Sequence, residues 1–155
     1  MKAEGMKVDR PPSNHMEVEG ELCKLFYQRF GKAALPIIEA VFAEWGRFLG
    51  EKMKSKLPSR DLRSVVRAHL QPSLEREPKP EILESSPSRV ELKVFACPYH
   101  LEGKGRELCQ AMMAMDREII KTAAEVQVKM SLPRSIAAGD EWCHGIFESL
   151  GPSSD

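Results

Sequence analysis

The chain has 155 residues, and its 23 Lys and Arg balance 23 Asp and Glu, so its formal net charge is zero. This length suits one domain with its own hydrophobic core. A composition of 42% hydrophobic and 30% charged residues is typical of a globular protein and argues against disorder. The lack of a basic excess argues against a nucleic-acid-binding protein, and no apolar run approaches the roughly 20 residues of a membrane span.

The N-terminal stretch predicts a cytoplasmic protein. Glu4, Asp9 and Glu17 interrupt it, and it lacks the apolar segment of a secretory signal. In a reducing compartment cysteines stay unpaired. The cysteines expected to be thiols are Cys23, Cys97, Cys109 and Cys143.

The first predicted elements are helices. Residues 1–14 are expected to form a loose tail and residues 15–150 a single domain. Apolar residues at three- and four-residue steps predict a helix over residues 16–30, closed by a glycine. A second helix runs over residues 32–57 up to Pro58, and a third covers residues 61–70.

Two glycines of the second helix, Gly46 and Gly50, lie four residues apart and therefore share a face. Another backbone could approach that face closely, because a glycine has no side chain to hold it away. Together with Trp45 these glycines fit either a dimer contact or packing within one chain.

After a Pro-rich connector at residues 71–80 the apolar residues alternate with polar ones, which predicts strands. The expected strands lie at residues 82–83 and 90–94 as a hairpin, at 126–130, and at 134–137 and 142–148 as a last hairpin. A helix over residues 102–122 lies between the hairpins. Helices segregated from an antiparallel sheet of about four strands indicate an α+β fold.

The helix expected at residues 102–122 carries a carboxylate on its apolar face. With 100° per residue and Leu108 at zero, the apolar stripe centres near about 60° and Asp116 lies at about 80°. Cys109 lies two turns earlier on the same line. A carboxylate directed into a core must be hydrogen-bonded, paired, metal-bound or protonated. A structural Asp held by backbone N–H groups and a functional acid, base or ligand both fit this pattern.

Three cysteines join Asp116 in the candidate site. Cys97 lies at a strand-to-loop exit, Cys143 lies within a strand, and Cys109 lies on the helix. Their spacing contains no CxxC and matches no zinc finger. Thiolates with Asp116 or His100 could still bind Zn²⁺. The alternative is that these cysteines are small packing residues.

The remaining cysteine and histidines suggest ordinary structural roles. Cys23 lies on the first helix beside apolar residues, so we interpret it as a core residue. His15 and His69 lie in the tail or near a helix end and are expected to be solvated. The roles of His100 and His144 stay open.

Several short motifs follow one another in a characteristic order. They are FGKAALP at residues 30–36, WGR at 45–47, Gly50, CPY at 97–99, ELC at 107–109, Asp116 and AGDEWC at 138–143. Over about residues 18–148 the chain therefore resembles the L-2-amino-thiazoline-4-carboxylic acid hydrolase family. That family is similar to 4-vinyl reductase sensor domains and, more distantly, to a Golgi-trafficking subunit fold.

The resemblance implies a ligand-binding α+β fold, often dimeric, with a small-molecule pocket between helices and sheet. It also implies that Cys97, Cys109, Asp116 and Cys143 are the signature positions, as catalytic residues or as zinc ligands. The expected partners are a small molecule and a second copy of the chain, with no nucleic acid.

The implied reaction opens a cyclic thiazoline by adding water, and two routes fit. A thiolate of Cys97 or Cys109 attacks the ring while Asp116 or a histidine moves protons, or cysteine-bound Zn²⁺ supplies hydroxide. A substrate carboxylate favours an arginine. The arginines considered are Arg47, Arg106 and Arg134. The alternative function is a non-catalytic sensing or interaction domain with structural cysteines or zinc.

Overall fold

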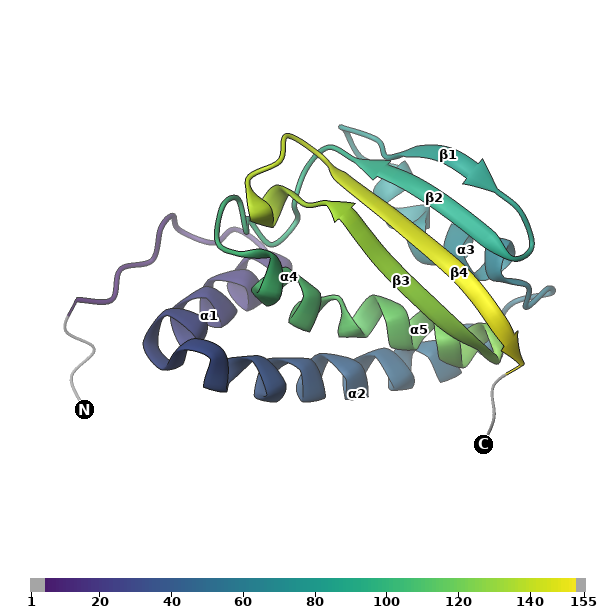
Figure 1. Ribbon diagram of the computed structural model, residues 1–155, viewed down its shortest axis with the longest axis horizontal. Coiled ribbons are helices and arrows are strands. Elements are labelled where there is room, and N and C mark those ends of the chain that lie inside the picture. Colours follow the sequence, from purple (N-terminus) through teal and green to yellow (C-terminus); the bar gives the residue numbers. More distant parts are fainter. Residues whose placement is uncertain (1–4, 153–155) are drawn as a thin grey trace.

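A four-stranded antiparallel sheet lies against helices gathered on one of its faces, as the computed structural model of residues 5–152 shows (Figure 1). The helices are α1 His15–Phe30, the 3₁₀ helix η1 Gly31–Ala34, α2 Leu35–Lys54, α3 Leu62–Leu74, α4 Arg106–Met112, α5 Ala114–Ala124 and the 3₁₀ helix η2 Ile136–Ala138. The strands are β1 Glu81–Ser85, β2 Arg89–Val94, β3 Val126–Arg134 and β4 Cys143–Pro152, in the sheet order β1-β2-β4-β3. The predicted α+β fold is confirmed.

Helix starts follow local sequence signals. The side chain of Asn14 accepts a hydrogen bond from the backbone N–H of Glu17 at 3.0 Å, and this caps α1. Asp61 caps α3 in the same way, at 2.9 Å from the N–H of Ser64. The end of α3 differs from the prediction, because the helix includes Pro72 and reaches Leu74. The predicted connector is therefore helical over residues 71–74.

Helix α2 packs closely on α5 through its two glycines. A Cβ atom at Gly46 would lie 2.4 Å from the carbonyl oxygen of Met115. At Gly50 a Cβ atom would lie 2.9 Å from the carbonyl oxygen of Ile119. The predicted close approach of another backbone is confirmed, and it occurs within the chain.

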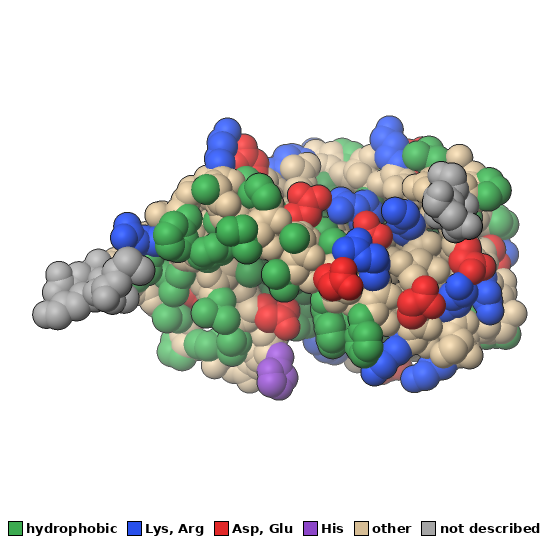
Figure 2. Space-filling model, turned by 90° about the horizontal axis from the view of Figure 1, so that it is seen from below, with side chains coloured by type: hydrophobic (Ala, Val, Ile, Leu, Met, Phe, Trp, Pro, Cys, Tyr) green, Lys and Arg blue, Asp and Glu red, His purple; other side chains and the backbone are tan. Residues whose placement is uncertain are grey.

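Helix α1 buries charged side chains beside the apolar residues Cys23 and Phe26 that pack against the core. Its buried side chains include Glu17, Glu21 and Lys24, whereas Val18 and Leu22 are exposed. Large apolar side chains of α1 and α2 are exposed, and we call them the apolar face. They are Val18, Leu22, Phe30, Ile37, Val41, Trp45 and Phe48. Figure 2 shows hydrophobic side chains gathered in the left half of the view from below and charged ones in the right half.

The segment predicted as one helix over residues 102–122 is two helices. Gly103 and Gly105 have positive φ angles of 67° and 118°, so the helix begins only at Arg106. It is interrupted at Met113. The flanking residues are Ala and Met, which favour helices, so local sequence gives no signal for the interruption.

The predicted last hairpin is only half present. Residues 142–148 lie in or next to β4, but of residues 134–137 only Arg134 belongs to a strand, as the last residue of β3, where it pairs with His144. Ile136 and Ala137 are buried in η2. Asp140 stabilises this turn by accepting the N–H of Ser135 at 2.8 Å. The antiparallel partner of β4 is therefore β3, with Met130 opposite Phe147.

The buried side chains form two clusters. One lies around α2 and α4 and includes Phe42, Tyr99 and Leu108. The other lies between α3, α5 and the sheet and includes Val65 and Ile120. Among residues 5–152, no helix is long and apolar enough to cross a membrane.

Candidate functional site

Asp116 on α5 hydrogen-bonds to His69 on α3. The Nε2 of His69 donates to the Oδ1 of Asp116 at 2.6 Å, and the side chains are 18% and 17% exposed. The helical pattern correctly directed Asp116 towards the interior. His69, by contrast, was predicted to be solvated, and that prediction is wrong. It lies in the interior of α3, because that helix continues to Leu74, and α3 packs on α5.

Burial and the charge of Asp116 have opposite effects on the pKa of His69. Desolvation alone would lower its pKa, but the hydrogen bond and the negative charge of Asp116 outweigh it, so the pKa of His69 is raised above 6.5. The negative charge of Asp116 also affects two other buried groups. It adds to burial in raising the pKa values of Tyr99 and Cys109.

The structure brings Cys97, Cys109 and Cys143 into one neighbourhood, with Cys143 close enough to affect both other thiols electrostatically. The Sγ of Cys97 accepts the N–H of Leu101 at 3.5 Å, and that of Cys143 accepts the N–H of Ile136 at 3.3 Å.

Ser135 lies beside Cys109 and Cys143. Its side chain is 0% exposed. The Oγ is buried without a hydrogen-bond partner among the described residues. Sequence reasoning did not single out Ser135, because a serine after a strand carries no signal of its own.

The thiols are held in their neutral form. Burial raises the pKa of Cys109 to about 11, and burial is also the main cause of the raised pKa values of Cys97 and Cys143. Cys23 packs against the core as predicted, and burial raises its pKa to about 11.

Three of the predicted zinc ligands, Cys97, Cys143 and Asp116, make hydrogen bonds within the chain. Over residues 5–152 no group of three or more His, Cys, Asp and Glu side chains is placed to hold a metal ion. Asp116 has His69 as its hydrogen-bond partner. Zinc therefore stays a prediction drawn from the chemistry of these side chains and from the resemblance.

The arginines considered for a substrate carboxylate have other partners. Arg47 lies 2.7 Å from Glu44 on the surface of α2. Arg106 donates to the carbonyl oxygen of Leu132, and Arg134 lies 4.8 Å from the ring centre of Trp142.

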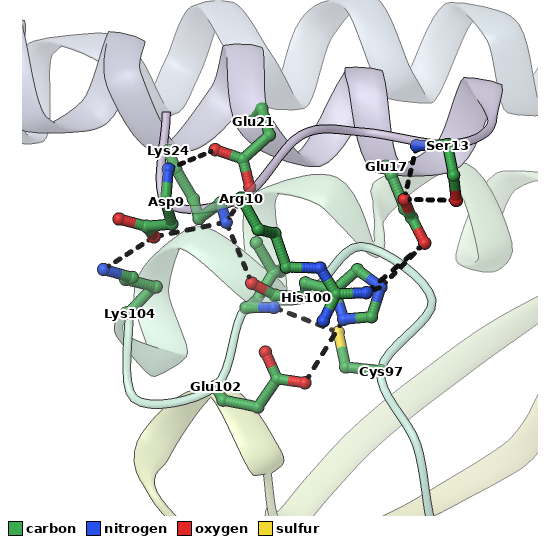
Figure 3. A network of polar contacts seen from close by, with 11 residues as sticks. Asp9, Arg10, Ser13, Glu17, Glu21, Lys24, Cys97, His100, Glu102 and Lys104 are labelled. Carbon is green, nitrogen blue, oxygen red and sulfur yellow. Dashed lines mark hydrogen bonds and ion pairs between the residues drawn. The ribbon is translucent and has the colours of Figure 1, made fainter. Parts of the chain in front are cut away.

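His100 joins a polar network that fixes the N-terminal segment. Its Nε2 lies 2.9 Å from Glu17 and 2.8 Å from Arg10, beside the loop that carries Cys97 (Figure 3). Lys24 lies 3.4 Å from Asp9 in the same network. Residues 1–4 of the predicted tail lie outside the described residues, and residues 9–13 are held by these contacts.

His144 lies away from this network, on the sheet. Its Nε2 is 3.0 Å from the Oε2 of Glu91 on the neighbouring strand. In β4 it follows Cys143, which bonds on the other side to the N–H of Ile136. The two adjacent side chains therefore serve different parts of the fold.

Comparisons with known proteins agree with this architecture. Residues 15–147 match the model of a family described as L-2-amino-thiazoline-4-carboxylic acid hydrolase. No curated protein matches the chain. The fold is similar to a trafficking protein particle complex subunit 3 from Naegleria fowleri, whose crystal structure holds covalently bound palmitic acid. The TM-score is 0.67 at 11% identity, over 90% of this chain and 98% of that one, which is a likeness of fold.

Proposed function

Since the chain belongs to the L-2-amino-thiazoline-4-carboxylic acid hydrolase family, we propose that it is a small-molecule hydrolase that opens a cyclic C–N or C–S substrate with water. The acid–base pair is His69 and Asp116. The observation that carries this assignment is their 2.6 Å hydrogen bond in a largely buried setting. A base held by a carboxylate is the arrangement that many hydrolases use to activate a nucleophile.

In the proposed reaction the neutral ring of His69 removes a proton from water as the water oxygen bonds to the ring carbon of the substrate. Asp116 holds the ring in place and stabilises the imidazolium that forms. His69 then returns the proton to the leaving nitrogen or sulfur as that bond to carbon breaks. Water is consumed, and the enzyme returns to its starting protonation state.

The properties of the thiols favour water over a cysteine as the nucleophile. A thiolate nucleophile needs a lowered pKa, whereas the pKa values of Cys97 and Cys109 are raised by burial. In this proposal the cysteines therefore shape the core beside Asp116. The nucleophilic roles predicted for Cys97, Cys109 and Cys143 stay predictions.

A non-catalytic ligand-binding domain is the second candidate function. The neutral thiols favour it, and so does the presence of two grooves of about 450 Å³, neither of which is lined by His69 or Asp116. On this alternative the pair of His69 and Asp116 would only tie α3 to α5.

Turnover of L-2-amino-thiazoline-4-carboxylic acid by purified wild-type, Asp116→Asn and His69→Gln proteins separates the two. The proposal expects measurable turnover that falls roughly 100-fold or more in both variants, while His144→Gln, with its Glu91 contact on the sheet, keeps it. Metal content measured on the same samples tests the zinc prediction. Absence of turnover in a folded wild-type protein would favour the ligand-binding alternative.

A further inference from the structure

A groove of about 450 Å³ lies where α2, the junction of α4 with α5, and β3 meet. Its lining includes Glu39, Gln110, Met113, Arg117, Met130 and Leu132. This volume lies within the range of small-molecule sites, which take roughly 300–1,000 Å³. Neither His69 nor Asp116 lines it, so an inference about this groove stands apart from the proposed hydrolysis.

The groove lies beside the point where α4 gives way to α5. Met113 lies between the two helices and lines the groove. Its backbone stays in the right-handed helical region, its N–H donates to the carbonyl oxygen of Cys109 at 2.8 Å, and its own carbonyl oxygen accepts the N–H of Arg117 at 3.1 Å. Both helices therefore present side chains to the same groove, Gln110 from α4 and Arg117 from α5.

Three charged side chains line the groove: Glu39, Glu107 and Arg117. Glu107 lies 3.7 Å from Lys32 and accepts the hydroxyl of Tyr27 at 3.2 Å. Arg117 on α5 lies 3.3 Å from Glu39 on α2, and these two side chains are 34% and 52% exposed. An ion pair this exposed contributes little to stability. A ligand with a carboxylate and a cationic nitrogen can therefore replace the pair at low cost, with one group on each partner.

The rest of the lining suits an apolar body. Met113, Met130 and Leu132 contribute hydrophobic side chains to the groove. Methionine side chains adapt to ligands of different shape, because they are unbranched and polarizable. We infer that the groove binds a small zwitterion of the α-amino-acid type, with its carboxylate on Arg117, its ammonium on Glu39 and its apolar side chain on the methionines.

The test follows methionine methyl signals in the full-length protein labelled with ¹³C at its 8 methionines. The signals of Met113 and Met130 are assigned from Met113→Leu and Met130→Leu. L-leucine is the probe, and L-leucine methyl ester and N-acetyl-L-leucine are matched probes that lack the negative and the positive charge. L-leucine is expected to shift the two signals in a saturable way, at least tenfold more tightly than either matched probe.

Variants then separate recognition from unspecific binding. Arg117→Gln and Glu39→Gln are expected to weaken L-leucine binding roughly 10- to 100-fold. Exchange of the charges in Glu39→Arg/Arg117→Glu is expected to restore it, because a zwitterion can bind in the opposite direction. Arg47→Gln is the control, since Arg47 lies on the same helix as Glu39 but pairs with Glu44.

Three results would overturn the inference. One is the absence of saturable shifts at Met113 and Met130 with L-leucine. Another is equal binding of N-acetyl-L-leucine, which would make the groove an anion site. The third is unchanged L-leucine binding by the Arg117→Gln protein, whose fold is checked by its remaining methionine signals.

Discussion

His69 and Asp116 lie 47 positions apart in the sequence and meet at 2.6 Å between α3 and α5. The contact ties two helices that flank the second core cluster and places a titratable base against a carboxylate. Because the two groups are more than four-fifths buried, water screens their interaction only weakly.

The first prediction concerns the pH dependence of stability through this pair. Asp116 keeps the folded pKa of His69 above its unfolded value of 6.5. The stabilisation is therefore fully present below pH 6.5 and is lost as the pH rises through the folded pKa. Asp116→Asn should lower the free energy of unfolding by about 1.5–3 kcal/mol at pH 6, and by less at pH 9.

Urea unfolding at both pH values measures this difference, and NMR titration of the His69 ring gives its pKa directly. The expected outcome is a lower His69 pKa in the Asp116→Asn protein. An unchanged pKa would mean that the carboxylate does not face the ring in solution.

The second prediction concerns the contact of α2 with α5. Gly46→Ala places a methyl group 2.4 Å from the carbonyl oxygen of Met115, so the helices must separate. We expect a loss of about 1–3 kcal/mol in the free energy of unfolding, although alanine is the better helix former. Gly145→Ala is the matched control, because its Cβ would meet nothing within 4 Å. Equal stability of the two variants would disprove the close packing.

The same glycines illustrate what the sequence could predict. Gly46 and Gly50 share a face by helical geometry alone, and Asp116 falls within an apolar stripe for the same reason. These are properties of a single helix, so periodicity reveals them. The β1–β2 hairpin is likewise local, and it was correctly expected.

The rest depends on how elements pack together. The contact of His69 with Asp116 forms only when α3 packs on α5, so the sequence around His69 does not indicate it. Arg117 likewise lines a groove only because β3 lies beside α5. The burial of charged side chains on α1 also escaped periodicity, since Val18 and Leu22 face outward while Phe26 packs against the core. The boundary between α4 and α5 at Met113 lies in a run of good helix formers, so the sequence gives no local signal for it.

The third prediction concerns the reactivity of the cysteines. Burial raises the pKa of Cys109 to about 11 and also raises that of Cys97. Alkylation by iodoacetamide at pH 7.5 should therefore be slow in the folded protein and should accelerate about tenfold per pH unit. Mass spectrometry after timed quenching identifies each site. Rapid modification of Cys97 at neutral pH would instead revive the thiolate route.

The fourth prediction concerns self-association, which the family resemblance also implies. The apolar face exposes roughly 700 Å² of hydrophobic side chain, taking large side chains at about 150–250 Å² each. A standard interface buries about 800 Å² on each partner. We therefore expect a homodimer through this face, which Val41→Glu/Trp45→Glu should convert to monomer.

Sedimentation velocity over a range of protein concentrations measures the change. Leu150→Glu serves as the control, because Leu150 is equally apolar and 65% exposed but lies on β4. A wild-type protein that sediments as a monomer at high concentration would contradict the prediction.

The last prediction concerns Glu17 and the N-terminal segment. The backbone N–H of Ser13, followed by His100 and the Ser13 hydroxyl, lowers the pKa of Glu17 from 4.5 to about 2. Its stabilisation is therefore present above pH 4.5 and is lost as the pH falls through about 2. Glu17→Gln should lower the melting temperature at pH 7, and the difference from wild type should shrink towards pH 2. The neighbouring exposed Glu19, as Glu19→Gln, is the control. Because Glu17 also holds Ser13 and lies 3.6 Å from Arg10, the variant should be cleaved faster by trypsin after Lys7, since the bond after Arg10 precedes a proline and is not cut. Unchanged cleavage together with unchanged melting would show that the network does not fix this segment.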